Sequence, residues 1–201
     1  MATTDLHLIR EQDGLSLQLA PLQGLWTEQQ YLALTDHTRH LIEFSDGVLE
    51  VLPMPTDQHQ VLVLFLYELL RAYVHPLGGK VLVAPLRLQV REGKQREPDL
   101  LLLCNAHDPR RQNRFWLGAD LVAEVVSPDC PERDTVAKVA DYAEAGIPEY
   151  WIVDPIAETL TVLTLQNGAY TTHGSFRRSQ LATSRLLGGL MVPVDALFDA
   201  H

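Results

Sequence analysis

Residues 121–155 read LVAEVVSPDCPERDTVAKVADYAEAGIPEYWIVDP, and their pattern predicts a strand, a helix and a second strand. LVAEVV (121–126) and EYWIVD (149–154) are short runs of β-branched, aliphatic and aromatic residues, which is typical of buried strands. Between them, ERDTVAKVADYAEAG (132–146) predicts a helix that Gly146 ends. This order predicts a mixed α/β fold built around a central sheet.

Glu124 stands inside the first of these apolar strands. Alternation along the strand places it on one face with Val122 and Val126. A buried carboxylate is costly without a cation, a hydrogen-bond partner or a raised pKa. Asp99 begins the preceding apolar strand, PDLLLLC (98–104). Because neighbouring strands lie about 4.8 Å apart, two such carboxylates can share one divalent ion.

The predicted helix carries Asp134, Lys138 and Tyr142 at intervals of four residues, which places them on one helical face. An ammonium group near a metal ion can orient water or neutralise the charge that develops when a phosphodiester is hydrolysed. Taken alone, however, the spacing of Asp134 and Lys138 is more typical of a surface ion pair.

Two further patterns are local signals in the first quarter of the chain. Thr27 and Gln30 have the spacing of a capping box, which predicts that a short helix begins there. Asp46-Gly47 lies between two apolar segments and predicts a tight hairpin turn, since this dipeptide tolerates positive φ angles.

The remaining elements are one helix and two strands. Residues 56–74 are apolar nearly all round and predict a buried helix, with Thr56 or Asp57 as its N-cap. KVLVAPLRLQV (80–90) and TLTVLTL (159–165) predict strands.

Length and composition favour one soluble domain. The chain has 201 residues, of which 46% are hydrophobic, so it can bury a full core. It contains no apolar run of about 18 residues that could span a membrane. Residues 1–14 lack the layout of a signal peptide. We therefore expect a cytoplasmic protein without a membrane segment.

Charge is unevenly distributed along the chain, whose formal net charge is -10. Residues 1–60 and 117–158 are strongly acidic, whereas residues 87–116 hold seven basic and four acidic residues. The overall charge argues against tight nonspecific binding of duplex DNA. A basic rim around an acidic cleft and an ordinary solvated surface both fit the basic segment.

Other chemistries find little support. Cys104 and Cys130 are expected to be reduced and to line the core. With His107 they lack a fourth ligand at zinc-like spacing. Ser127 lacks the Gly-x-Ser-x-Gly setting of a serine hydrolase.

Taken together, these motifs resemble the Uma-two family of restriction-endonuclease-like proteins. The resemblance covers most of the chain, and the string GIPEYWIVDP (146–155) is its most specific part. It is carried by the following residues and strings: Asp99 in PDL, Glu124 in AEVVSP, Asp134, Lys138, Tyr142, AGIPEYWIVDP, TEQQYLAL, and IEFSDGVLEVLPMPTDQHQ with Glu43, Asp46-Gly47 and His59.

The resemblance implies the PD-(D/E)xK nuclease fold, a mixed sheet flanked by helices, with an N-terminal helix and β-hairpin extension. It divides one domain, 1–201, into an N-terminal extension (about 1–55), a nuclease core (about 56–165) and a C-terminal extension (about 166–201). Asp99 and Glu124 are then ligands of Mg²⁺ or Mn²⁺.

The catalytic residues that the resemblance implies are Asp99, Glu124 and Lys138. One departure concerns the lysine, because the superfamily pattern places it two residues after the acidic ligand, where this chain has Val126. Lys138 stands in from the following helix. Glu43, His59, Asp134 and Tyr142 are expected to support the site, although a capping or core role suits His59 equally well.

Two functions follow for this fold. The first is a metal-dependent endonuclease that hydrolyses DNA and acts as a homodimer, because two sites related by a twofold axis most simply cut both strands. The second is a catalytically inactive domain that binds nucleic acid or protein and retains the acidic site. The apolar stretch LLGGLMVPVDALF (186–198) suits a core role better than a dimer interface.

Overall fold

The computed structural model describes residues 7–9, 12, 14 and 16–201. The segment 1–14, where no signal-peptide layout was found, lies largely outside the described residues. Within the described ranges, no helix combines the length and apolar composition needed to cross a membrane.

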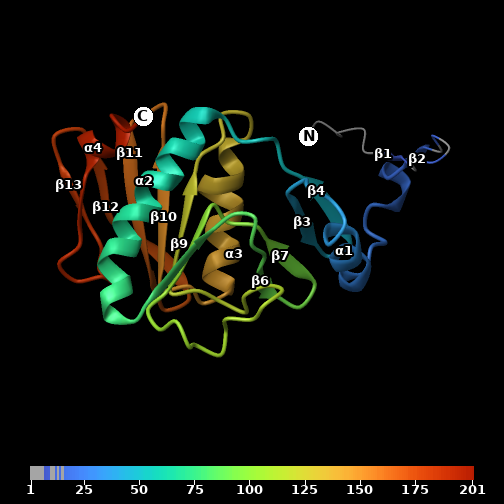
Figure 1. Cartoon of the computed structure of the whole chain (residues 1–201), viewed down its shortest axis with the longest axis horizontal. Coiled ribbons are helices and arrows are strands. Elements are labelled where there is room, and N and C mark those ends of the chain that lie inside the picture. Colours follow the sequence, from blue (N-terminus) through green and yellow to red (C-terminus); the bar gives the residue numbers. More distant parts are fainter. Residues whose placement is uncertain (1–6, 10–11, 13, 15) are drawn as a thin grey trace.

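A six-stranded mixed sheet forms the centre of the molecule, in the order β12-β11-β10-β9-β8-β5 (Figure 1). Strands β9 and β10 run parallel, and every other neighbouring pair is antiparallel. The predicted central mixed sheet is therefore confirmed. Its strands are β5 (Lys80–Val83), β8 (Leu100–Leu103), β9 (Leu121–Val125), β10 (Glu149–Asp154), β11 (Thr159–Gln166) and β12 (Ala169–Arg177).

Helices α2 (Asp57–Val74) and α3 (Lys138–Glu144) pack against opposite faces of this sheet. A π-helical turn, Arg133–Ala137, leads directly into α3. The alternation predicted for β9 is confirmed, because its odd-numbered residues join the core under α2 and Val122 joins the core under α3. Glu124 therefore points toward α3.

A smaller four-stranded sheet, β4-β3-β7-β6, lies beside the central one (Figure 1). Helix α1 packs on it, and a small apolar cluster that includes Tyr31 and Phe44 fills the space between them. Its elements are α1 (Glu28–Thr35), β3 (Ile42–Ser45), β4 (Val48–Val51), β6 (Leu88–Arg91) and β7 (Lys94–Arg96); β1 (His7–Ile9), β2 (Ser16–Gln18) and a 3₁₀ turn (Ala20–Leu22) precede them.

Both local signals in this region are confirmed. The Thr27 hydroxyl accepts the Gln30 N–H, and the Gln30 side chain accepts the Thr27 N–H, which completes the capping box. In the hairpin turn between β3 and β4, Asp46 and Gly47 have φ angles of 48° and 85°. A Cβ at Gly47 would lie 2.6 Å from the Gly24 carbonyl oxygen, so the turn requires glycine.

Two predicted elements differ from the structure. The segment 80–90 is not one strand but two, β5 and β6, which belong to different sheets. Pro85 separates them, because it has no N–H to continue a ladder. Helix α2, N-capped by Thr56, is buried along one face only, and Leu64 on its outer face is 50% exposed.

The C-terminal segment completes the core under α2. Leu190, Val192 and Leu197 are buried there against residues of α2 and the central sheet. This placement supports the core role expected for residues 186–198, while the division of the chain at about 55 and 165 stays a prediction. The remaining elements are a 3₁₀ turn (His75–Leu77), β13 (Leu181–Thr183), β14 (Met191–Pro193) and α4 (Val194–Phe198).

Glu149, at the start of β10, fastens this C-terminal segment to the sheet. Its side chain is buried and accepts hydrogen bonds from the Trp151 indole and the Ser184 hydroxyl, at 2.7 and 2.6 Å. The backbone N–H groups of Arg185 and Leu186 donate to its second oxygen at 2.8 and 2.9 Å. Four neutral donors thus stabilise a carboxylate that forms no ion pair with any residue the structure describes.

We predict that Glu149→Ala lowers the free energy of unfolding by about 3 kcal/mol, because four buried donors lose their acceptor. Glu68→Ala, on the exposed side of α2, should change it by no more than about 0.5 kcal/mol. Urea denaturation followed by tryptophan fluorescence measures both, and equal effects would contradict the structural role of Glu149.

Candidate active site

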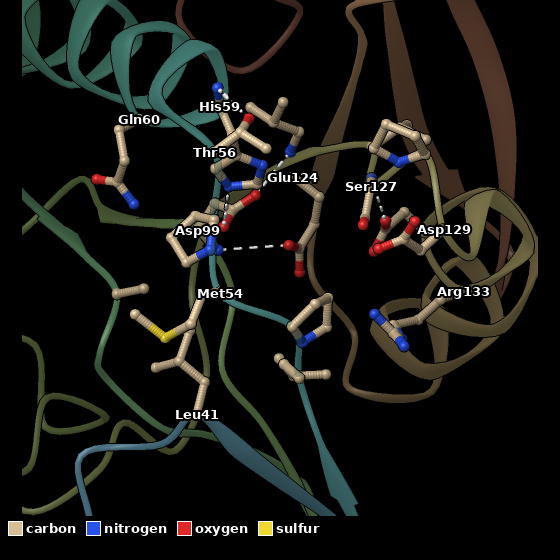
Figure 2. Close-up of a pocket in the computed structure, with 18 of the residues that line it drawn as sticks. Leu41, Met54, Thr56, His59, Gln60, Asp99, Glu124, Ser127, Asp129 and Arg133 are labelled. Carbon is tan, nitrogen blue, oxygen red and sulfur yellow. Dashed lines mark hydrogen bonds and ion pairs between the residues drawn. The ribbon is translucent and has the colours of Figure 1, made fainter. Parts of the chain in front are cut away.

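Asp99 and Glu124 meet where strand β8 begins and strand β9 ends. The antiparallel register pairs Leu100 with Ala123, so the next residues outward, Asp99 and Glu124, face each other. The Asp99 N–H donates to Glu124 Oε2 at 3.4 Å, and the Val125 N–H donates to Asp99 Oδ2 at 2.8 Å. The structure therefore brings together the two carboxylates that the sequence placed on separate strands (Figure 2).

Glu124 is only 3% exposed, and its Oε1 has two partners besides the Asp99 N–H that donates to Oε2. The Tyr142 hydroxyl donates to its Oε1 at 2.5 Å, and Lys138 Nζ lies 2.9 Å from the same oxygen. Burial raises the pKa of Glu124 to about 8; Lys138 opposes this shift, and the nearby carboxylate of Asp99 adds to it. Burial likewise keeps the pKa of Tyr142 well above its ordinary value, so its hydroxyl stays a donor.

Lys138 lies at the centre of a cluster of three carboxylates. Its side chain is 3% exposed, and Nζ lies 2.9 Å from Glu124, 3.1 Å from Asp134 and 3.7 Å from Glu43. These carboxylates outweigh the effect of burial and raise the pKa of Lys138 well above its ordinary value. The ammonium is therefore permanently charged, and it points toward the strand ends.

The pair between Asp134 and Lys138 is buried, so the interpretation of a surface ion pair was wrong. The Asp134 side chain is 4% exposed, and its second oxygen accepts the Ser127 N–H at 3.4 Å. Its backbone carbonyl, within the π-helical turn, accepts the Tyr150 hydroxyl at 2.8 Å. Sequence spacing predicted the pair, whereas the packing of the turn onto the sheet decided its burial.

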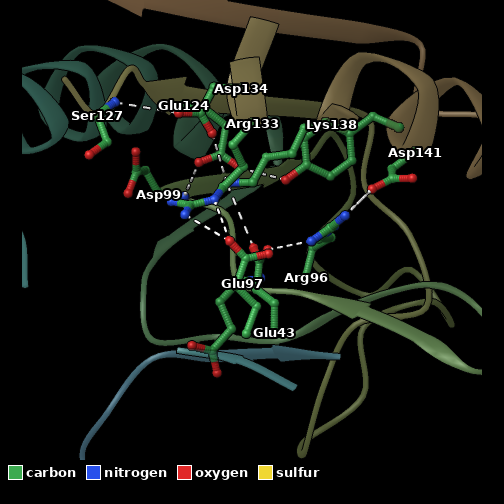
Figure 3. Close-up of polar contacts among 12 residues, drawn as sticks. Glu43, Arg96, Glu97, Asp99, Glu124, Ser127, Arg133, Asp134, Lys138 and Asp141 are labelled. Carbon is green, nitrogen blue, oxygen red and sulfur yellow. Dashed lines mark hydrogen bonds and ion pairs between the residues drawn. The ribbon is translucent and has the colours of Figure 1, made fainter. Parts of the chain in front are cut away.

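Glu43 reaches the cluster from the smaller sheet (Figure 3). It is 1% exposed; Arg96 Nη1 lies 2.5 Å from its Oε2, and the Glu97 N–H donates to its Oε1 at 3.2 Å. Burial disfavours the charged form, but Lys138 and Arg96 outweigh it and hold the pKa of Glu43 below its ordinary value. Glu43 is therefore an ionised link between the smaller sheet and helix α3.

Arg96 and Asp141 extend this network, and neither was identified from the sequence. Arg96 contacts Asp141 Oδ2 through Nε and Nη2 at 2.8 and 2.5 Å, and Lys94 Nζ contacts Oδ1 at 2.6 Å. The sequence did contain a signal for Arg96, because Lys94 and Arg96 are two residues apart and therefore lie on the same face of β7. Nothing in the sequence indicated that this face would meet α3.

His59 lies on the other side of the carboxylate pair. Its Nε2 is 2.9 Å from Asp99 Oδ1, while its backbone N–H donates to the Thr56 hydroxyl that caps α2. The helix start thus fixes the imidazole next to Asp99. The side chain lies at the site, and only the backbone takes part in capping.

A pocket with a volume of about 190 Å³ opens above these groups (Figure 2). Its acidic side includes Asp99, Glu124 and Asp134, and an apolar side is formed by Leu41 and Met54 among others. Three charged lining residues, Glu97, Asp129 and Arg133, were not identified from the sequence. Burial, with Glu43 as the next cause, raises the pKa of Glu97 to about 7, and its side chain accepts the Ile42 N–H at 3.2 Å.

The basic residues of 87–116 are paired, and Arg111 and Arg114 among them lie exposed on the surface. Arg111 donates to the Ala106 carbonyl oxygen at 2.9 Å. The other six basic residues, each paired with a carboxylate, are Arg87, Arg91, Lys94, Arg96, Arg110 and Arg114.

The expectation that both cysteines line the core was wrong. Cys104 is exposed and Cys130 is partly exposed, and both are free thiols. Cys104 follows the end of β8, where the chain leaves the sheet, so the strand's apolar environment does not extend to it.

The fold belongs to the restriction-endonuclease-like class. The chain aligns with the crystal structure of "a putative nuclease belonging to DUF820" from Anabaena variabilis ATCC 29413, with a TM-score of 0.72 and 21% sequence identity. The alignment covers 86% of this chain and 97% of that chain. A comparison with curated proteins gives no match.

The family follows from the sequence model that matches residues 28–195. That model is Uma2, described as "Putative restriction endonuclease", and it covers well over half of the chain. The chain therefore belongs to the Uma2 family. This confirms the resemblance found in the sequence.

We predict that Glu124 titrates near pH 8 in the metal-free protein, far above its ordinary value of 4.5. Between these values the folded protein holds a proton that the unfolded chain has released. Its contribution to stability is therefore present below pH 4.5 and is lost as the pH rises to about 8. Carboxyl ¹³C chemical shifts measure the titration.

Two variants should move this pKa in opposite directions. Asp99→Asn removes a neighbouring negative charge and should lower the pKa of Glu124. Tyr142→Phe removes a donor to the ionised form and should raise it. Equal titration in both variants and the wild type would show that these contacts do not control Glu124.

Proposed function

We propose that this chain is a divalent-metal-dependent nuclease that hydrolyses phosphodiester bonds in DNA. The observation that carries the proposal is the meeting of Asp99, Glu124 and Lys138 beside one pocket. Membership of the Uma2 family and the shared fold support a nucleic-acid substrate. Asp99 and Glu124 would hold Mg²⁺ or Mn²⁺.

The donor set at the strand ends suits Mg²⁺. Among the described residues, no three His, Cys, Asp or Glu side chains form a group that could hold a metal ion. Mg²⁺ does not need such a cage, because it commonly takes one or two carboxylates and completes its shell with water and substrate phosphate. Burial and the neighbouring carboxylate of Asp99 both raise the pKa of Glu124, and a bound cation would stabilise its ionised form.

When bound, the ion would polarise the phosphate and lower the pKa of a water molecule. The protein's own groups orient the ligands. His59 holds Asp99 from one side, and Tyr142 holds Glu124 from the other. Both carboxylates are thus fixed by partners on helices that cover opposite faces of the sheet.

Lys138 supplies a fixed positive charge to the same place. Its Nζ touches Glu124 Oε1 and lines the pocket, so it can stabilise negative charge that develops on a phosphate held beside Glu124. Asp134 and Glu43 hold the ammonium in position. Lys138 thereby acts beside Asp99 and Glu124 although it lies on helix α3 and not on a strand.

We predict that the wild-type protein cleaves DNA with Mg²⁺ or Mn²⁺ and that Lys138→Met lowers the rate at least about 100-fold. Methionine keeps the length of the side chain and removes the charge. Plasmid and single-stranded oligonucleotide substrates, resolved on gels, measure cleavage. Thermal unfolding shows whether the variant remains folded.

Matched controls separate catalysis from folding. Lys80→Met removes a lysine from the end of β5 that lies away from Asp99, and it should leave cleavage unchanged. Mg²⁺ should lower the pKa of Glu124 even when no DNA is present. Absence of cleavage of DNA or RNA with every divalent ion would instead favour a catalytically inactive binding domain.

We also propose that the active form is a homodimer. Each chain holds one candidate site, and two sites related by a twofold axis cut a duplex most directly. The buried residues of 186–198 belong to the core of the chain itself and do not support an interface from this stretch.

We predict by light scattering a mass of twice 22.6 kDa at micromolar concentration. A plasmid assay gives an independent measurement, because a dimer yields linear product together with nicked circles, whereas a monomer yields nicked circles first. A mass of 22.6 kDa at all concentrations would remove the dimer and leave a nicking enzyme.

A further inference from the structure

The pocket holds more negative than positive charge. Its permanent cations are Lys138 and Arg133. Lys138 is almost fully buried among three carboxylates, so its charge is already balanced. Besides the proposed metal ion, a phosphate that enters therefore calls for a further cation from the protein. The carboxylates that line the pocket are Glu97, Asp99, Glu124, Asp129 and Asp134.

Arg133 reaches the pocket from the start of the π-helical turn, on the side opposite His59 and Asp99 (Figure 2). Its Nε and Nη2 lie 3.0 and 2.7 Å from the same oxygen of Glu50. Within the described part of the chain, its Nη1 has no hydrogen-bond partner. One oxygen of Glu50 thus occupies the Nε–Nη2 edge of the guanidinium, and Nη1 on the opposite side is available to a ligand.

Glu50 is a weak competitor for this arginine. It lies on β4, does not line the pocket, and its side chain is 45% exposed. An ion pair with such an exposed partner contributes little to stability. A phosphate offers several oxygens to the planar fork of an arginine and can engage it at two points.

Since a nuclease must hold the phosphate beside its carboxylates, and thus on the basis of the proposed function, we propose that Arg133 binds a backbone phosphate of the DNA. Glu50 holds the guanidinium in the free protein and releases it when the phosphate arrives. Arg133 is then the residue that recruits the substrate, whereas Lys138 acts on the reacting phosphate.

The test is a double-mutant cycle on binding. Fluorescence anisotropy of a labelled single-stranded DNA oligonucleotide is measured in Ca²⁺, with gels to confirm that the DNA stays intact. Arg133→Gln should weaken binding about tenfold and reduce the slope of log K against log salt by about 0.7. Glu50→Gln should tighten binding about threefold, because it removes the competitor.

The double variant identifies the cause of that tightening. If Glu50 acts through Arg133, Glu50→Gln has no effect when Arg133 is already glutamine. Asp129→Asn, which removes another carboxylate at the pocket, should tighten binding equally in both backgrounds. Arg71→Gln, on α2 about 18 Å along the helix from His59, is the matched control and should not change binding.

If the ion pair between Arg133 and Glu50 only stabilises the fold, the variants should show a different pattern of binding and stability. Loss of binding in both Glu50→Gln and Arg133→Gln, accompanied by equal losses of thermal stability, would overturn the proposal. An unchanged salt slope in a folded Arg133→Gln would also overturn it. If the wild type cleaves DNA in either case, the nuclease function stands without this role for Arg133; absence of both cleavage and binding removes both.

Discussion

The buried ammonium of Lys138 is the constraint around which the rest of the site is arranged. A charge taken out of water requires opposite charges at contact distance. Here those charges come from three places: Glu124 on β9, Asp134 in the π-helical turn and Glu43 on the hairpin strand β3. The central sheet, helix α3 and the smaller sheet must therefore be in their native positions together before the lysine is neutralised.

The three carboxylates around Lys138 outnumber its single positive charge. Arg96 pairs with Glu43 on the side away from Lys138 and also with Asp141. Glu124 faces Asp99, and among the residues that the structure describes Lys138 is its one cationic partner. This difference explains why the pKa of Glu43 is lowered and that of Glu124 is raised, although both are buried. The part of the cluster nearest the pocket is the part that can accept a further cation.

The basic residues of 87–116 are also largely paired with carboxylates. Among the basic residues of 87–116, Arg91, Lys94 and Arg96 pair with carboxylates of α3. They join the smaller sheet to this helix, and their pairing leaves little free positive charge for a nucleic acid. Binding of a phosphate therefore depends on the few cations that border the pocket. The formal net charge of -10 likewise argues against tight nonspecific attraction to duplex DNA.

The sequence by itself predicted most of the elements around the site and the first set of candidate residues. Apolar strand patterns, the capping box at Thr27 and the Asp46-Gly47 turn are local, since each depends on neighbours within a few residues. The family resemblance supplied Asp99, Glu124 and Lys138 as a set. Tertiary structure decided what no local pattern contains: the register that sets Asp99 against Glu124, the burial of the pair between Asp134 and Lys138, and the partners of Arg96 and Arg133. These depend on contacts between residues far apart in the chain, where charge and burial are fixed only when the two sheets and α3 come together.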